Sequence, residues 1–154
     1  MKISEYLSLD LINYDLKSKN KQEVINELAT LLSSKYPELN HDTIITILNE
    51  REKLGSTGIG YGIAIPHGKL KINSDKLYIS LGISKKGIDF NAIDGKPVYI
   101  FFVLLAPEQA TKKHLMALAK ISRILKKSTL KEKIINATSK EDIYKMIKEE
   151  DEKI

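Results

Sequence analysis

With 154 residues, of which 42% are apolar, the chain can bury one hydrophobic core, and we expect a single domain over residues 1–154. It contains no cysteine, which excludes disulfides, thiolate nucleophiles and the common structural zinc sites. The net charge of +5 comes from lysines that are mixed with acids throughout, so we expect no nucleic-acid binding.

The sequence predicts neither a signal peptide nor a membrane-spanning helix. The first residues, MKISEYLSLD, include acids and lack an apolar core segment, unlike a signal peptide. The longest apolar run, Val98 to Ala106, is far too short for a helix that crosses a bilayer. We therefore expect a soluble, cytoplasmic protein with no direct membrane insertion, and a frayed tail over residues 149–154.

The first predicted helix covers residues 20–35. Asn20 and Glu23 stand at the spacing of a capping box, and Pro37 follows the end of the helix. One helical face carries Val24, Leu28, Leu31 and Leu32. This pattern is typical of an amphipathic helix that packs on a core.

A second helix is predicted from near Asp42 to the residues before Gly55, with an apolar stripe of Ile44, Ile47 and Leu48. Arg51 continues this stripe in the last turn. A guanidinium there must reach solvent, pair with an acid or serve a ligand at the helix end. The sequence leaves both a structural salt bridge and a ligand contact open.

The segment REKLGSTGIGYGIAIPHGKL, residues 51–70, holds five of the eight glycines. It is not a P-loop, because five residues separate Gly62 from Gly68 where the motif needs four. It is not a dinucleotide fingerprint either, because Ile63 stands where a glycine is required. Nucleotide binding therefore loses its main support.

The glycines still suit a loop whose backbone N–H groups converge on an anion. Ser56 and Thr57 would add hydroxyl donors, and Gly58 would allow close approach, so we predict that residues 56–58 bind a phosphoryl group. A plain surface loop with turn residues is the alternative.

His67 directly follows Pro66, which fixes the backbone at the end of the apolar segment GIAI. An imidazole held in one tautomer beside Arg51 and N–H donors would be a neutral nucleophile for a phosphoryl group. We find no carboxylate–histidine spacing typical of a metal site, so we predict no metal and no cofactor.

Two strands are predicted next. Residues 77–84 alternate strictly between apolar and small or polar side chains, which is typical of a strand covered on one face. Asp94 and Gly95 form a turn signal before PVYIFFVLLAP, whose unbroken apolar character favours a central strand covered on both faces.

The C-terminal part is predicted to be helical. A helix from Thr111 carries a stripe of Leu115, Leu118, Ile121 and Leu125, and further helices fit residues 129–137 and 140–150. His114 lies in the first turn on the side facing the sheet, where either a ligand contact or a structural hydrogen bond is possible. The fold class is thus α/β, with a mixed parallel and antiparallel central sheet flanked by helices on both faces.

Residues 51–69, REKLGSTGIGYGIAIPHGK, closely resemble the phosphorylation-site signature of the EIIA domains of the fructose-mannitol class of the bacterial phosphoenolpyruvate-dependent sugar phosphotransferase system. The later segment LLAPEQATKKHLMALAKISRIL is similar to the family's second motif, and the resemblance covers essentially the whole chain. It implies that His67 is the phosphoryl acceptor and that Arg51 and His114 are the family's active-site arginine and second histidine.

The resemblance also implies two protein partners. In that family the histidine takes a phosphoryl group from the phosphohistidine of the carrier protein HPr and passes it to a cysteine of an EIIB domain, which links the chain indirectly to the membrane component EIIC. We expect an apolar docking surface around His67, with Glu50 and Glu52 as candidate acids on it.

Three roles remain open. We prefer a sugar-transport subunit, with fructose-type sugars as a family-level expectation. The first alternative is a nitrogen-related regulatory EIIA, whose phosphorylation state would control its binding to other proteins. The second is a module that controls a transcriptional regulator as part of a longer chain.

Overall fold

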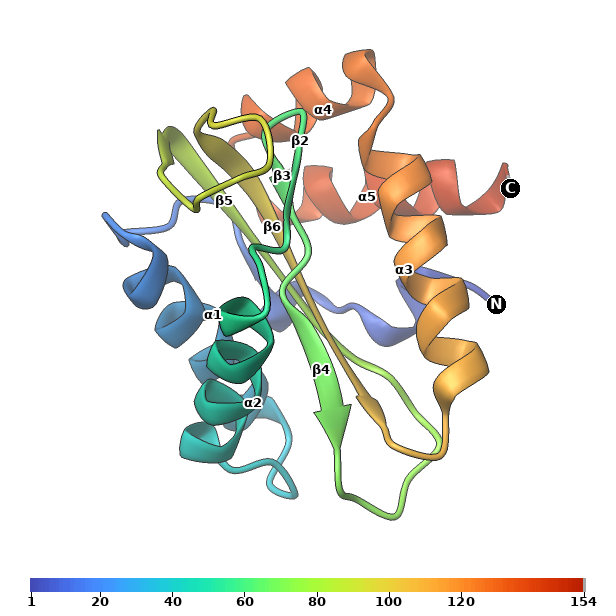
Figure 1. Ribbon diagram of the computed structural model, residues 1–154. Coiled ribbons are helices and arrows are strands. Elements are labelled where there is room, and N and C mark those ends of the chain that lie inside the picture. Colours follow the sequence, from blue (N-terminus) through green and yellow to red (C-terminus); the bar gives the residue numbers. More distant parts are fainter. Residues whose placement is uncertain (154) are drawn as a thin grey trace.

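The computed structural model, which describes residues 1–153, places a central sheet between two groups of helices (Figure 1). On one side lie α1 (Lys21–Lys35) and α2 (His41–Lys53). On the other lie α3 (Thr111–Leu125), α4 (Ser128–Ile135) and α5 (Lys140–Glu152). The short 3-10 helices η1 (Ile3–Tyr6) and η2 (Leu9–Leu11) precede the first strand. The predicted α/β class with helices on both faces is confirmed.

The sheet is mixed, as predicted. Its strands are β1 (Ile12–Asn13), β2 (Gly58–Gly60), β3 (Ile63–Ala64), β4 (His67–Leu70), β5 (Tyr78–Ile88) and β6 (Val98–Pro107). The spatial order is β1-β5-β6-β3-β2, and β4 also pairs with β6. β5 and β6 are antiparallel neighbours, whereas β3 and β4 run parallel to β6, one after the other. Pro66, between them, accepts a hydrogen bond from Leu104 N, which places His67 at the start of β4.

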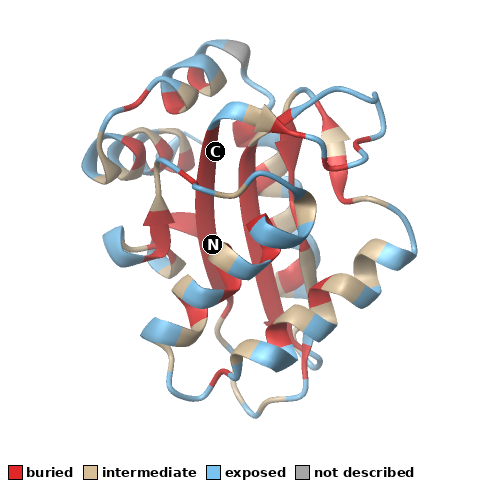
Figure 2. Cartoon of the chain, turned by 90° about the vertical axis from the view of Figure 1, so that its left-hand side faces the viewer, coloured by how far each residue is buried: buried red, intermediate tan, exposed pale blue. Residues whose placement is uncertain are grey.

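The prediction that strand 77–84 is covered on one face only is wrong, because residues 77–84 are all buried. Figure 2 shows the strands as the buried centre of the molecule, with exposed positions on the outer faces of the helices. The polar face of β5 is covered by α1. The hydroxyl of Ser80 donates to the carbonyl of Leu28 at 3.2 Å, and Gly82 leaves room for the side chain of Leu28. Small residues on this face allow the helix to approach closely.

The helix boundaries follow the sequence signals closely. The Asn20 side chain caps α1 by accepting a hydrogen bond from Glu23 N, whereas the Glu23 side chain accepts from Lys19 N rather than closing the capping box on Asn20. Asn40 caps α2 by accepting from Thr43 N. None of the helices within residues 1–153 combines the length and apolar character needed to cross a membrane.

The prediction of a frayed tail is wrong for residues 149–152, which complete α5. Asp151 is fully buried and accepts hydrogen bonds from both the backbone and the hydroxyl of Ser4. Its other carboxylate oxygen pairs with Lys120 Nζ at 2.6 Å. This carboxylate therefore ties the end of the chain to its beginning and to α3. Ile154 lies outside the described residues.

Gly68 allows α2 to pack directly on β4. A Cβ at this position would lie 2.2 Å from Cγ2 of Ile47. We expect Gly68→Ala to lower the free energy of unfolding by about 2 kcal/mol, because the helix must shift to remove the clash. Urea unfolding of Gly68→Ala, Ile47→Ala and the double variant tests this. The free energy of unfolding of the double variant should fall by less than the sum of the two single decreases. A decrease equal to that sum would contradict the clash.

Candidate active site

A cleft of about 990 Å³ lies between α2, β4 and α3, and Arg51, His67 and His114 line it together. Each residue comes from a different element: Arg51 from the last turn of α2, His67 from the start of β4 and His114 from the first turn of α3. The structure thus brings together the three residues predicted to carry the chemistry. His41 lies elsewhere, at the start of α2, where its ring contacts the Thr30 hydroxyl.

The imidazole of His67 is held in one orientation by the backbone. Its Nδ1 lies 2.7 Å from the carbonyl oxygen of Ile65. A carbonyl oxygen only accepts hydrogen bonds, so Nδ1 carries the proton and Nε2 carries a lone pair. Burial, together with the positive charge of Arg51, holds the pKa of His67 below its ordinary value. The ring is therefore a neutral nucleophile at pH 7.

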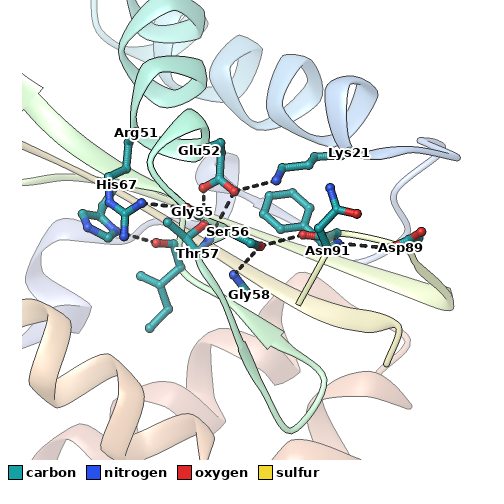
Figure 3. A network of polar contacts seen from close by, with 12 residues as sticks. Lys21, Arg51, Glu52, Gly55, Ser56, Thr57, Gly58, His67, Asp89 and Asn91 are labelled. Carbon is teal, nitrogen blue, oxygen red and sulfur yellow. Dashed lines mark hydrogen bonds and ion pairs between the residues drawn. The ribbon is translucent and has the colours of Figure 1, made fainter. Parts of the chain in front are cut away.

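The guanidinium of Arg51 is anchored at the end of α2. Its Nη1 donates a hydrogen bond to the carbonyl oxygen of Gly55 at 2.7 Å (Figure 3). The structural salt bridge that the sequence left open is absent from the ion pairs within residues 1–153. A guanidinium has several N–H groups, so this arrangement suits an anion held beside His67.

His114 faces His67 across the cleft. The two rings meet edge to face, with centroids 5.6 Å apart. His114 is 5% exposed, and its buried Nε2 has no hydrogen-bond partner within residues 1–153. Burial, with the charges of His67 and Lys69, lowers the pKa of His114 to about 4. A buried polar atom without a partner is costly, and a ligand oxygen in the cleft would satisfy it.

The low pKa of His114 makes the stability of the fold depend on pH. Unfolding returns this pKa to about 6.5, so below that value the unfolded chain binds a proton that the folded chain excludes. The stabilising contribution is therefore complete above pH 6.5 and is lost as the pH falls towards 4. We expect His114 to account for a loss of about 2 kcal/mol in unfolding free energy between pH 7.5 and pH 5.

Urea unfolding of the wild type and of His114→Gln at pH 7.5 and pH 5 measures how much of the loss in unfolding free energy comes from His114. The variant should lose less stability on acidification by about the same amount, since glutamine does not titrate. The carboxylates remain in both proteins, so their contributions cancel in the comparison, whereas the measured share includes the coupling of His114 to His67. An identical pH dependence of the two proteins would contradict the buried, neutral state of His114.

The polar groups of residues 56–58 are engaged with the protein rather than with the cleft. The backbone N–H and the hydroxyl of Thr57 both donate to the carboxylate of Glu52. The hydroxyl of Ser56 donates to the Phe90 carbonyl at 2.6 Å and accepts a hydrogen bond from Gly58 N. These contacts give the predicted phosphoryl-binding segment a supporting position, because its two hydroxyls and the N–H groups of Thr57 and Gly58 already have protein partners.

Backbone conformation and close packing explain why glycine occupies several positions of this loop. Gly55, Gly60 and Gly62 have φ values of +141°, +89° and +75°, in the region that favours glycine. At Gly58, a Cβ would lie 2.9 Å from Ala92. The glycine cluster therefore shapes and packs the loop, and anion approach is not needed to explain it.

The rim of the cleft carries exposed leucines beside charged residues such as Glu50 and Lys69. Leu54 at the end of α2 is 85% exposed, and Leu115 on α3 is 62% exposed. The predicted stripe of α3 had Leu115 facing inward; instead His114, Ala117, Ile121, Ile124 and Leu125 form the buried face. Glu50 lines the cleft, but the predicted docking role of Glu52 is wrong, because its side chain is 6% exposed and turned into the protein.

The cleft suits an anion held by cationic and N–H groups. Within residues 1–153, no group of three or more histidine, aspartate or glutamate side chains is placed to hold a metal. Arg51 supplies positive charge, and His114 supplies a buried nitrogen that faces the same space. The arrangement can therefore hold and transfer a small anionic group at His67 Nε2.

Comparison with known proteins gives one consistent result. Residues 5–150 match the family described as "Phosphoenolpyruvate-dependent sugar phosphotransferase system, EIIA 2". The chain is 37% identical over 150 residues to the "Nitrogen regulatory protein" of Bradyrhizobium diazoefficiens, covering 96% of this chain and 95% of that protein. It is 38% identical over 153 residues to the "PTS system fructose-specific EIIABC component" of Bacillus subtilis, covering 98% of this chain but only 24% of that protein.

The fold is similar to that of a solved relative. The crystal structure of the nitrogen regulatory protein IIA-Ntr from Neisseria meningitidis superimposes with a TM-score of 0.87 at 34% sequence identity. The match covers 94% of this chain and 98% of that one.

Proposed function

Because the chain belongs to the EIIA 2 family of the phosphoenolpyruvate-dependent sugar phosphotransferase system, we propose that it relays a phosphoryl group through His67. One observation carries this proposal. The hydrogen bond from Nδ1 to the Ile65 carbonyl leaves the lone pair on Nε2, in a cleft that Arg51 and His114 also line. This geometry supplies a neutral nucleophile together with groups that can hold the charge of a phosphoryl group.

The transfer is an in-line displacement. The lone pair of His67 Nε2 forms a bond to phosphorus while the bond between phosphorus and the donor's histidine nitrogen breaks, and that electron pair returns to the donor ring. The Nδ1 proton of His67 stays in its hydrogen bond to Ile65, so no base is required. The positive charge that develops on the ring is stabilised by the Ile65 carbonyl.

Arg51 and His114 hold the equatorial oxygens of the phosphoryl group during transfer. The guanidinium offers N–H groups and positive charge, and His114 Nε2 offers a buried position for one further hydrogen bond. Phosphoryl transfer depends mainly on positioning and on charge stabilisation, which these two residues supply. Ser56, Thr57 and Gly58 enter the proposal as support for the loop, since their donors already have protein partners.

The partners we propose are HPr as donor and an EIIB cysteine as acceptor, in the cytoplasm and without nucleic acid, metal or cofactor. Domains of this family pass phosphate to EIIB partners. The exposed side chains of Leu54 and Leu115 at the rim give both proteins an apolar surface on which to dock in turn. Association with the membrane would be indirect, through EIIB and EIIC.

Two downstream roles are consistent with the same chemistry. Fructose-type sugar uptake agrees with the relative from Bacillus subtilis, whereas a regulatory role agrees with the relative from Bradyrhizobium diazoefficiens, which matches over nearly its full length. In the first role the phosphoryl group moves on to EIIB. In the second, the phosphorylation state of His67 controls the binding of other proteins.

Incubation of the protein with phosphoenolpyruvate, enzyme I and HPr, followed by intact-mass measurement, tests the relay. We expect a gain of one phosphoryl group, and no gain with a competent HPr would contradict the proposal. Addition of fructose-type EIIB then separates the two roles. Rapid loss of the group to the EIIB cysteine supports transport, and retention supports regulation.

A further inference from the structure

Glu52 follows Arg51 in α2 but points the other way, into the protein (Figure 3). Its side chain is 6% exposed, and Oε1 pairs with Lys21 Nζ at 2.8 Å. Lys21 comes from the first turn of α1 and also lies over the ring of Phe90, 4.6 Å from its centroid. A carboxylate this deeply buried is stable only with such partners, so its contacts are specific.

The carboxylate of Glu52 holds Thr57 at two points. Oε1 accepts a hydrogen bond from Thr57 N at 3.1 Å, and Oε2 accepts one from the Thr57 hydroxyl. Thr57 is itself 3% exposed. Because one acid binds both the backbone and the side chain, it fixes the position of this residue as well as its rotamer.

Thr57 in turn connects to both functional residues. Its carbonyl accepts a hydrogen bond from Ile65 N at 3.0 Å, and the Ile65 carbonyl accepts from Nδ1 of His67 at 2.7 Å. Two residues before Thr57, the Gly55 carbonyl accepts from Arg51 Nη1 at 2.7 Å. The segment held by Glu52 therefore supplies the acceptor of Arg51 directly and orients His67 through one intervening residue.

We propose that Glu52 is a positioning residue for phosphoryl transfer, acting through Thr57 on the orientation of both His67 and Arg51; this rests on the proposed relay function. Glu52 does not line the cleft with the reacting groups, so it acts on the rate without touching the phosphoryl group. Its removal changes geometry rather than docking, because the exposed side chains of Leu54 and Leu115 at the rim stay unchanged.

The charge of Glu52 supports the same assignment. The charged or titratable groups that act on His67 are Arg51 and Glu52 from α2 and His114 from α3. Arg51 lowers the pKa of His67, and Glu52 raises it. Glu52 therefore offsets part of the lowering of the His67 pKa that burial and Arg51 cause.

The test compares Glu52→Gln with a matched control, Glu149→Gln, which removes an exposed carboxylate on α5. Glutamine removes the negative charge that pairs with Lys21, and its amide nitrogen cannot accept the hydrogen bond that Oε2 takes from the Thr57 hydroxyl. The charge-assisted contacts that hold Thr57 are therefore weakened or reversed. With phospho-HPr as donor, we expect kcat to fall about 30-fold for Glu52→Gln while KM stays within about twofold. The control should match the wild type.

A second pair of variants tests the same contact without replacing the buried carboxylate of Glu52. Thr57→Val removes only the hydroxyl contact, and we expect a fall of about tenfold in kcat, whereas Thr57→Ser keeps that contact and should recover most of the rate. Thermal unfolding checks that each variant is folded. Equal rates for the Val and Ser variants, or an unchanged kcat for folded Glu52→Gln, would overturn the proposal.

A readout that needs no transfer separates this proposal from the relay itself. The ring nitrogen chemical shifts of His67 report its tautomer, and we expect a single Nδ1–H form in the wild type and a mixture in Glu52→Gln. If the wild type accepts no phosphoryl group, the relay is contradicted, and the tautomer still decides the role of Glu52. An unchanged tautomer and His67 pKa in Glu52→Gln would contradict positioning even if the relay holds.

Discussion

His67→Ala is expected to abolish phosphorylation completely, because no other group in the cleft combines a free lone pair with access to the donor. Nδ1 of His67 is committed to the Ile65 carbonyl, so Nε2 is the only reactive atom of this ring. The His114 ring faces His67 edge to face but is only 5% exposed, so the donor has little access to it. Intact mass after incubation with phosphoenolpyruvate, enzyme I and HPr measures the effect.

The matched control is His41→Ala, which removes a histidine at the start of α2 that contacts Thr30 outside the cleft. It should accept one phosphoryl group as the wild type does. Brief acid treatment of the wild type should release the group, since a phosphorus–nitrogen bond hydrolyses at low pH whereas a phosphoserine ester survives. Phosphorylation of His67→Ala to the wild-type extent would place the acceptor elsewhere.

Arg51→Ala should slow transfer about 150-fold, the cost of roughly 3 kcal/mol when one preorganised donor is removed from a charged transition state. The guanidinium is anchored on Gly55 and lines the same cleft as His67, so it is in place before the phosphoryl group arrives. Rapid-quench measurement of transfer from phospho-HPr gives the rate. Arg123→Ala, an exposed arginine on α3, is the matched control.

The pH of this assay matters. Arg51 lowers the pKa of His67, so its removal raises that pKa and increases the protonated, unreactive fraction near neutrality. Measurement at pH 8.5, where the ring is neutral in both proteins, isolates the lost charge stabilisation. A wild-type rate for Arg51→Ala at that pH would remove Arg51 from the mechanism. Arg51→Lys should recover part of the rate, because it restores charge without the planar fork.

Much of the fold could be predicted from local patterns. The cap Asn20, the apolar stripes of α1 and α2 and the apolar run of β6 lie where the sequence indicated. The antiparallel pairing of β5 and β6 follows from the turn at residues 94–95. These features depend on neighbours along the chain, so one sequence is enough to find them.

The errors have a common physical cause. The alternation in residues 77–84 indicated one exposed face, but α1 covers that face, and small residues there serve close packing. His114 was predicted to face the sheet and is buried, but Leu115, which was assigned to the same apolar stripe, is exposed. In both cases the neighbouring element, which is distant in the sequence, decides which side of a strand or helix meets water.

The sequence by itself determined the class of the fold, the resemblance to a phosphotransferase domain and the three residues that meet in the cleft. Only the tertiary structure decided which nitrogen of His67 carries the lone pair, which partners the side chains of residues 56–58 bind and the place of Glu52 between Lys21 and Thr57. The reason is how far apart in the sequence the interacting residues lie. Helix and strand patterns repeat over a few residues, whereas the hydrogen bonds that orient a side chain join segments that only folding brings together.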